Sequence, residues 1–182
     1  DDPRAHDVRE LTERIDQGLQ ETVRSVRNLA REIRPGILDE LGLPAALEWL
    51  VRDLRDAFDG SVTLETDDED AVDLPPERAI HAFRVAQEAL TNALRHGDPE
   101  RVQVELRADG DEVVLRVEDD GRGFPAGTDP KGLGTLNMRE RGWILGGELE
   151  MDSTPGEGSV VVLRVPRTGM TPEAAELEAV ST

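Results

Sequence analysis

The chain has 182 residues, 37% of them hydrophobic, which is enough for one compact domain with a helical appendage. There is no cysteine, which excludes disulfides, thiolate metal sites and cysteine nucleophiles. The 40 acidic residues outnumber the 21 basic ones, and the formal net charge of −19 argues against nucleic-acid partners, whose phosphates attract basic surfaces. An anionic nucleotide therefore needs a local device, such as backbone amides, a helix N-terminus or a bridging cation.

No apolar run approaches the roughly 20 residues that a membrane span requires, and no signal peptide is visible. The sequence begins inside a polar stretch, so we expect a piece of a longer chain in which any membrane anchor lies upstream. Lys131 is the only lysine. The acidic, arginine-rich composition fits adaptation to high salt and GC-rich coding equally well.

Residues 4–34 carry one apolar stripe at helical spacing. Its members recur every three or four positions and are Leu11, Ile15, Leu19, Val23, Val26, Leu29 and Ile33. Such a helix has no core of its own and resembles the seam of a helical bundle, which needs a partner. Pro35-Gly36 interrupts it, and a second amphipathic helix is expected over about 44–57.

After residue 60 the pattern changes from helical spacing to a mixture of alternating and helical segments. We expect, in chain order, a strand over 61–66, an acidic loop over 67–73, a helix over about 76–96, strands over 101–108 and 112–118, a glycine-rich stretch over 119–134, a helix over 135–145, and strands over 147–152 and 159–166. These elements predict an α+β fold, a two-layer α/β sandwich with helices on one face of a mixed, largely antiparallel sheet.

The helix over 76–96 contains a polar face. Glu88, Asn92 and Arg95 lie at i, i+4 and i+7, and His96 follows. A stripe facing solvent would show the same spacing. Asn92 argues against that alternative, because asparagine is a mediocre helix former, whereas its amide oxygen suits Mg²⁺.

Three glycine-containing turns complete the set of candidate segments. Asp119 ends a strand, followed by Gly121 and Gly123; a carboxylate there could accept an exocyclic amine while glycines admit a flat ring. The segment 131–134 precedes a helix N-terminus, which can present amides to phosphate, and 156–159 is a turn with a hydroxyl at its exit. Each alone also fits an ordinary turn or hairpin, and none is a P-loop or a dinucleotide fingerprint.

Together and in this order, the four segments resemble the GHKL ATPase superfamily of histidine kinases, type II topoisomerases, mismatch-repair ATPases and heat-shock chaperones. Residues 87–96, 138–147 and 33–43 resemble, more narrowly, the sensor kinases that include nitrate sensors and the membrane-fluidity thermosensor. The resemblance covers about residues 8–167 and implies the GHKL type of sandwich. Thr135, where relatives often have leucine, and Trp143, where they have a smaller residue, depart from the pattern.

The resemblance implies a role for each polar residue of the long helix. Asn92 would be the Mg²⁺ ligand, and Glu88 would lie beside it on the metal and water side, as the second of two catalytic residues. Arg95 and His96 would lie toward the phosphates of ATP. ATP and Mg²⁺ are thus the expected cofactors.

The remaining site residues implied by the resemblance surround the base and the phosphates. Asp119 would bind the adenine amino group, and Ser159 would support the adenine site. The glycines expected to line the base are Gly121 and Gly123. The residues expected in a lid over the phosphates are Gly132, Leu133 and Gly134.

We expect four segments: a partial dimerisation helix over 1–36, a connector over 37–60, a catalytic domain over 61–167, and a disordered tail over 168–182. The expected function is that of the catalytic region of a two-component sensor histidine kinase. It would transfer the γ-phosphate of ATP to a histidine on an upstream dimerisation helix, for relay to an aspartate of a response regulator receiver domain. A homodimer, a cytoplasmic location and no nucleic-acid partner follow.

The phosphoacceptor is the part of this expectation that the sequence does not supply. His6-Asp7 has the right dipeptide, but it lies only 28 residues before Arg34, at the start of the second dimerisation helix. We therefore expect that this chain does not phosphorylate itself. The alternatives are a serine kinase of the anti-sigma-factor type and an ATP-binding signalling module without transfer activity.

Overall fold

The computed structural model describes residues 36–72, 74–124 and 133–167. The helix expected over 4–34 and the tail expected over 168–182 lie outside these residues. The described helices are α2 (Gly36–Arg55), α4 (Pro76–Asn92) and α5 (Leu133–Ile144), and α4 is followed by the π-helical turn η1 (Ala93–Gly97). A short helix, α3 (Glu69–Val72), lies inside the expected acidic loop. The strands are β1 (Ser61–Thr66), β2 (Arg101–Asp109), β3 (Glu112–Asp119), β4 (Glu148–Thr154) and β5 (Gly158–Pro166).

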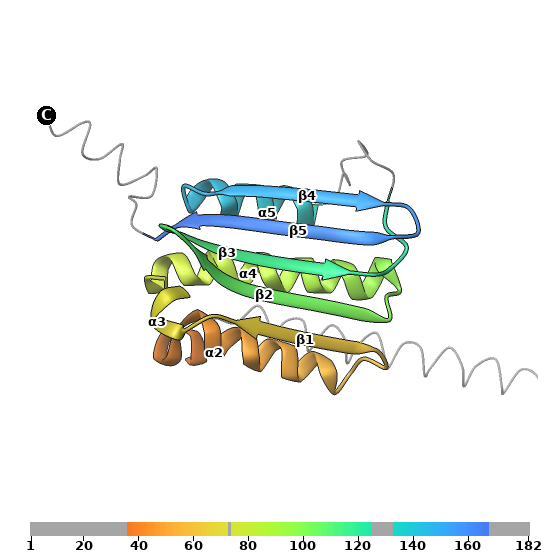
Figure 1. The fold of residues 1–182 in the computed structure, drawn as a ribbon, viewed down its shortest axis with the longest axis horizontal. Helices are drawn as coiled ribbons and strands as arrows, with labels where there is room; N and C mark the ends of the chain where they lie inside the picture. The colour runs from red at the N-terminus through yellow and green to blue at the C-terminus, as the bar shows by residue number, and fades with distance from the viewer. Residues whose placement is uncertain (1–35, 73, 125–132, 168–182) are drawn as a thin grey trace, which may run out of the picture. The chain divides into compact units, whose positions relative to one another are not determined.

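The strands form one five-stranded sheet in the order β1-β2-β3-β5-β4. β1 pairs with β2 in parallel, and the other neighbours are antiparallel. Helices α2, α4 and α5 all lie behind the sheet in Figure 1, on one face. The expected two-layer sandwich with a mixed, largely antiparallel sheet is therefore confirmed.

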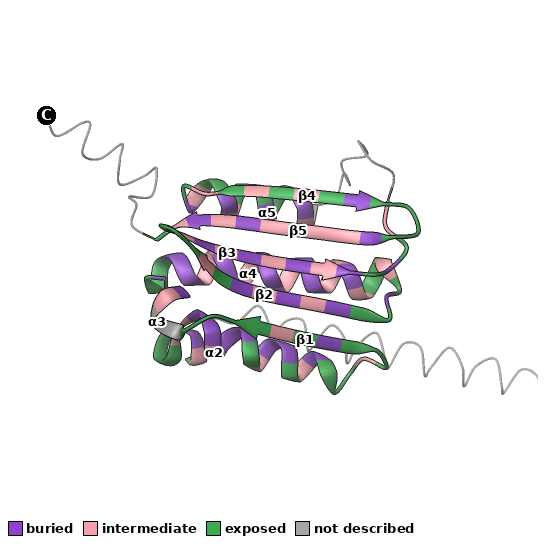
Figure 2. Cartoon of the chain, in the orientation of Figure 1, coloured by how far each residue is buried: buried purple, intermediate pink, exposed green. Residues whose placement is uncertain are grey.

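The core fills the space between the helices and this face of the sheet. Alternate positions of β2 and β3 are buried, as the purple bands of the central strands show in Figure 2, whereas the edge strands β1 and β4 are mostly exposed or intermediate. Period-2 burial is what a sheet covered on one face requires. The largest fully buried side chains are aliphatic except for Phe83 and Met138.

Helix α2 begins earlier than the sequence indicated. It starts at Gly36 instead of about residue 44, and it is broken at Gly42, whose φ of 78° lies in the left-handed region that favours glycine. The break allows Leu38 and Leu43, on either side of it, both to be buried. The segment expected to be a connector thus packs its apolar side into the same core as the sheet, while the proposed domain boundaries stay a prediction.

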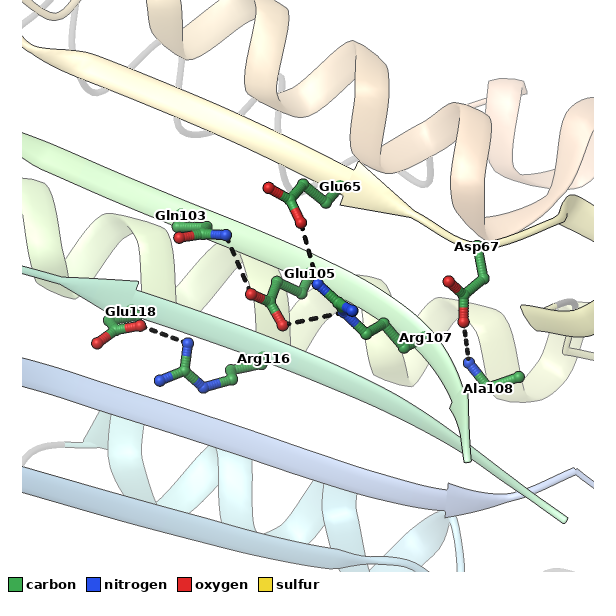
Figure 3. A network of polar contacts seen from close by, with 8 residues as sticks. All are labelled: Glu65, Asp67, Gln103, Glu105, Arg107, Ala108, Arg116 and Glu118. Atoms are coloured by element: carbon green, nitrogen blue, oxygen red, sulfur yellow. Dashed lines mark hydrogen bonds and ion pairs between the residues drawn. The ribbon is translucent and has the colours of Figure 1, made fainter. Parts of the chain in front are cut away.

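The opposite face of the sheet carries a network of charged and amide side chains (Figure 3). Arg107 contacts Glu65 at 3.0 Å and Glu105 at 3.2 Å, and Arg116 pairs with Glu118 on β3. The Arg107–Glu65 pair joins β2 to β1, and such a pair of opposite charges on neighbouring strands stabilises their pairing modestly. This face of the sheet is therefore a polar, solvated surface.

His81 joins α4 to α5 through a side-chain contact. Its Nδ1 lies 3.3 Å from Nη1 of Arg141. Burial, and secondly the positive charge of Arg141, lower the pKa of His81 below its usual value. A neutral imidazole accepts the hydrogen bond that the guanidinium donates. His81 thus makes a structural contact between the two helices.

A buried arginine connects the start of α4 with the ends of α5 and β5. Arg78 is only 5% exposed. Its Nη2 donates to the carbonyl oxygen of Leu145 at 2.8 Å, and its Nη1 donates to that of Arg167 at 3.3 Å. Burial lowers the pKa of this guanidinium from its usual value. The side chain thus provides donors for carbonyls at two chain segments far apart in the sequence.

We expect Arg78→Ala to lower the free energy of unfolding by about 2–4 kcal/mol, because two carbonyls lose charged donors and the arginine stem leaves a void. Arg107→Ala, which removes an exposed arginine with two ion pairs, should cost less than about 1 kcal/mol. Denaturant unfolding of both variants measures the difference. Equal losses would contradict the role given to Arg78.

Candidate nucleotide-binding site

A cavity of about 460 Å³ opens between α4 with η1, the first turn of α5, and the ends of β3 and β5. This volume falls within the roughly 300–1,000 Å³ of small-molecule sites. The residues that line it are Glu88, Ala89, Thr91, Asn92, Ala93, Arg95, His96, Gly97, Val117, Asp119, Gly123, Phe124, Gly134, Thr135, Met138, Met151, Ser159, Val160 and Val161. Residues of the polar helix face and of all three glycine-containing turns predicted from the sequence therefore meet in one place.

The helix side of the cavity contains four polar residues named from the sequence. Glu88 and Asn92 are half-buried, and Arg95 and His96 are exposed. Within the described ranges, none of these four side chains has a hydrogen bond or ion pair. Polar groups that face a cavity without internal partners are available to a ligand.

The helix predicted to run to about His96 does reach that residue, but only its first part is α-helical. The α-helix α4 ends at Asn92, and residues 93–97 form the wider π-helical turn η1. Asp98 then adopts a left-handed φ of 51°. Arg95 therefore leaves the regular i+7 position, and the exposed side chains of Arg95 and His96 both line the cavity. Such π-turns inside helices are frequent at functional sites.

The strand side is centred on Asp119, which is 6% exposed at the end of β3. Its Oδ2 accepts a hydrogen bond from Oγ of Ser159 at 2.5 Å, and its Oδ1 accepts one from the amide of Gly121 at 2.9 Å. Asp119 and Ser159 lie directly opposite each other on β3 and β5. A carboxylate offers about four lone-pair sites, so two remain for further donors such as an amino group.

The predicted glycines have different surroundings. Gly123 and Gly134 line the cavity, whereas Gly121 does not. A Cβ at Gly121 would lie 2.5 Å from the carbonyl oxygen of Gly97, so this glycine lets the loop pack against η1. A Cβ at Gly134 would lie 1.9 Å from Oε1 of Glu88, which places that carboxylate against the first turn of α5. Gly132 lies outside the described residues.

Residues 77–169 match the family described as the histidine kinase-, DNA gyrase B-, and HSP90-like ATPases. The chain belongs to this ATPase family. It is 35% identical over 159 residues to the oxygen sensor histidine kinase NreB of Staphylococcus carnosus. That match covers 86% of this chain and 46% of NreB, so the chain spans about half the length of this curated relative.

Solved structures agree with the family assignment. The histidine kinase domain of the blue-light activated histidine kinase of Erythrobacter litoralis is 31% identical, with a TM-score of 0.55 over 68% of this chain and 58% of that one. The histidine kinase AdeS of Acinetobacter baumannii is 16% identical, with a TM-score of 0.60 over 84% of each chain, and supports the fold alone. The resemblance to GHKL ATPases, and within them to sensor histidine kinases, is thus confirmed.

Sequence reasoning missed several residues that line the ATPase cavity. They are mainly apolar or small: Thr91, Phe124, Met138, Met151, Val160 and Val161. Helical spacing of i+3 from Glu88 could have indicated Thr91, and the family-like run at 138–141 could have indicated Met138. The contribution of β4 and β5 depends on how β5 pairs with β3 and how β4 pairs with β5, which no local pattern shows.

The described residues contain no group of three or more histidine or acidic side chains that could hold a metal ion by themselves. Mg²⁺ usually keeps several waters and binds substrate phosphates, so it does not require such a cluster. The ATPase domain as described also has no helix long and apolar enough to cross a bilayer. Leu133, the last of the predicted lid residues, begins α5, and its side chain is not among those that the structure describes.

Proposed function

We propose that the chain is the ATP-binding catalytic region of a sensor histidine kinase, which transfers the γ-phosphate of ATP to a histidine on a dimerisation helix. The observation that carries the proposal is the buried carboxylate of Asp119, held by Ser159 at the end of a cavity of nucleotide size. The names of NreB and of the Erythrobacter protein, both histidine kinases at above 30% identity, favour this function over a serine kinase or a non-catalytic module.

In this proposal, the strand side of the cavity binds the base and the helix side binds the phosphates. Asp119 accepts the adenine amino group, and Gly123 lets the flat ring approach the backbone. Arg95 and His96, which line the cavity, would lie toward the phosphates. Gly134 would belong to the lid together with Gly132 and Leu133. A local cluster of donors is required because the chain carries a formal net charge of −19, which repels a nucleotide at a distance.

Mg²⁺ fits the donor set on α4. The amide oxygen of Asn92 is a hard ligand, and the Glu88 carboxylate lies one helical turn before it on the same wall. The ion, when bound, neutralises charge that develops on the phosphates during transfer. Asn92 is fixed by its position on α4, and Glu88 would orient water or an acceptor proton. Neither side chain makes a hydrogen bond or ion pair in the described part of the chain.

Asn92→Ala should remove the magnesium dependence of ATP binding without unfolding the domain, because alanine is the better helix former. Calorimetric titration with ATP, with and without Mg²⁺, measures the effect alongside thermal unfolding. Gln103→Ala, which removes an amide from the solvated face of the sheet, is the matched control. An Asn92→Ala protein that responds to Mg²⁺ as the parent does would exclude Asn92 as the ligand.

The acceptor and the partners belong to the whole protein. We propose a homodimer formed through the dimerisation helices, a response regulator receiver domain as the next acceptor, and a cytoplasmic location for this region. Membrane attachment would come only through segments upstream of this region. His6-Asp7 is not the acceptor in this proposal, because it lies too close to Arg34 for the geometry that the family implies.

With γ-labelled ATP and Mg²⁺, this chain alone should gain no acid-labile, base-stable phosphate. A sensor-kinase segment that bears His-Asp on a first dimerisation helix should become labelled when it is added, because it supplies the imidazole next to a carboxylate. Label on His6 would overturn the alignment of the N-terminal helix. Failure to label any added segment, together with full ATP binding, would favour the non-catalytic module.

A further inference from the structure

A buried serine connects the loop after β3 to the β4–β5 hairpin. Ser153 is 5% exposed. Its Oγ accepts a hydrogen bond from the amide of Phe124 at 2.8 Å and donates one to the carbonyl oxygen of Gly158 at 2.8 Å. A hydroxyl can do both at once, since it has one hydrogen and two lone pairs. Phe124 lines the nucleotide cavity, whereas Ser153 does not.

Glycines bring the two backbones close enough for one small side chain to join them. Gly123 has a φ of 59°, and a Cβ there would lie 2.2 Å from the carbonyl oxygen of Thr154. Gly158 has a φ of 97°, and a Cβ there would lie 1.8 Å from the carbonyl oxygen of Asp119. Both conformations favour glycine, and both positions exclude any larger residue. The contact is therefore between main chains, with Ser153 as its side-chain link.

The register of the strands couples this link to the carboxylate of the site. Ser153 lies opposite Ser159 on β5, and Ser159 lies opposite Asp119 on β3. Directly opposed residues on neighbouring strands project to the same face. Oγ of Ser159 lies 2.5 Å from Oδ2 of Asp119. A shift of the hairpin would therefore move Ser159 away from Asp119.

We propose that Ser153 is a positioning residue of the nucleotide site: it holds the base-binding wall in place and so sets the affinity for ATP without touching the nucleotide. The inference rests on the proposed binding of adenine at Asp119. Removal of Oγ leaves the part-buried amide of Phe124 and the buried carbonyl of Gly158 without this partner. The loop and the hairpin then separate to reach water, and the wall loses its shape.

The test compares Ser153→Ala, Ser153→Thr and Ser61→Ala in the whole chain by calorimetric titration with ATP and Mg²⁺, well below each melting temperature. Ser153→Ala should bind ATP and ADP about tenfold more weakly. Ser153→Thr keeps the hydroxyl and should recover most of the affinity. Ser61→Ala removes an exposed hydroxyl from β1 and should bind as the parent does.

A purely structural serine would lower the melting temperature and leave the Kd of the folded protein unchanged, and that result overturns the proposal. Amide exchange of Phe124 in the parent provides a test that needs no variant: slow exchange is expected, and exchange at the rate of an unprotected amide overturns the link. A parent that binds no nucleotide contradicts the proposed function as well. A parent that binds ATP, with Ser153→Ala equal to it, contradicts this inference alone.

Discussion

The hydrogen bond between Ser159 and Asp119 is the interaction on which the cavity depends, because it joins the ends of two neighbouring strands across 40 residues of sequence. It places a buried carboxylate, 6% exposed, at the end of β3 with a fixed orientation. Main-chain contacts surround it: the amide of Gly156 donates to the carbonyl of Arg122 at 2.7 Å, and the amide of Arg122 donates to that of Gly97 at 2.7 Å. The loop after β3 is thus held from the hairpin side and from the η1 side together.

A hydrogen-bonded strand side faces a helix side on which Glu88, Asn92, Arg95 and His96 make no hydrogen bond or ion pair among the residues described. This difference suits a nucleotide, since the base needs a preorganised partner, whereas phosphates and a metal ion need groups that can adjust. The negative charge of the chain increases the need for such local groups. With a formal net charge of −19, a triphosphate gains nothing from long-range attraction, and local donors and a bridging cation have to provide the binding energy.

Much of this site could be predicted from residue order alone. The spacing of Glu88 and Asn92, the strand exit at Asp119 and the hydroxyl at Ser159 identified both sides of the cavity, and alternation predicted the sheet. The π-helical turn after Asn92 and the helical residues before the break at Gly42 were not predicted, because the apolar and polar spacing at these positions does not distinguish them from an α-helix end and a connection. The contribution of β4 depends on strand register in the same way.

We propose above all that Asp119 recognises the amino group of adenine. Calorimetric titration of the parent chain with ATP and with GTP, repeated on Asp119→Asn, tests that claim directly. A site built around a buried acceptor should prefer ATP by at least about a hundredfold, because GTP presents a carbonyl oxygen to the carboxylate and leaves it unpaired. Asp119→Asn should lose that preference while remaining folded. Equal affinities of the parent for ATP and GTP would contradict the assignment.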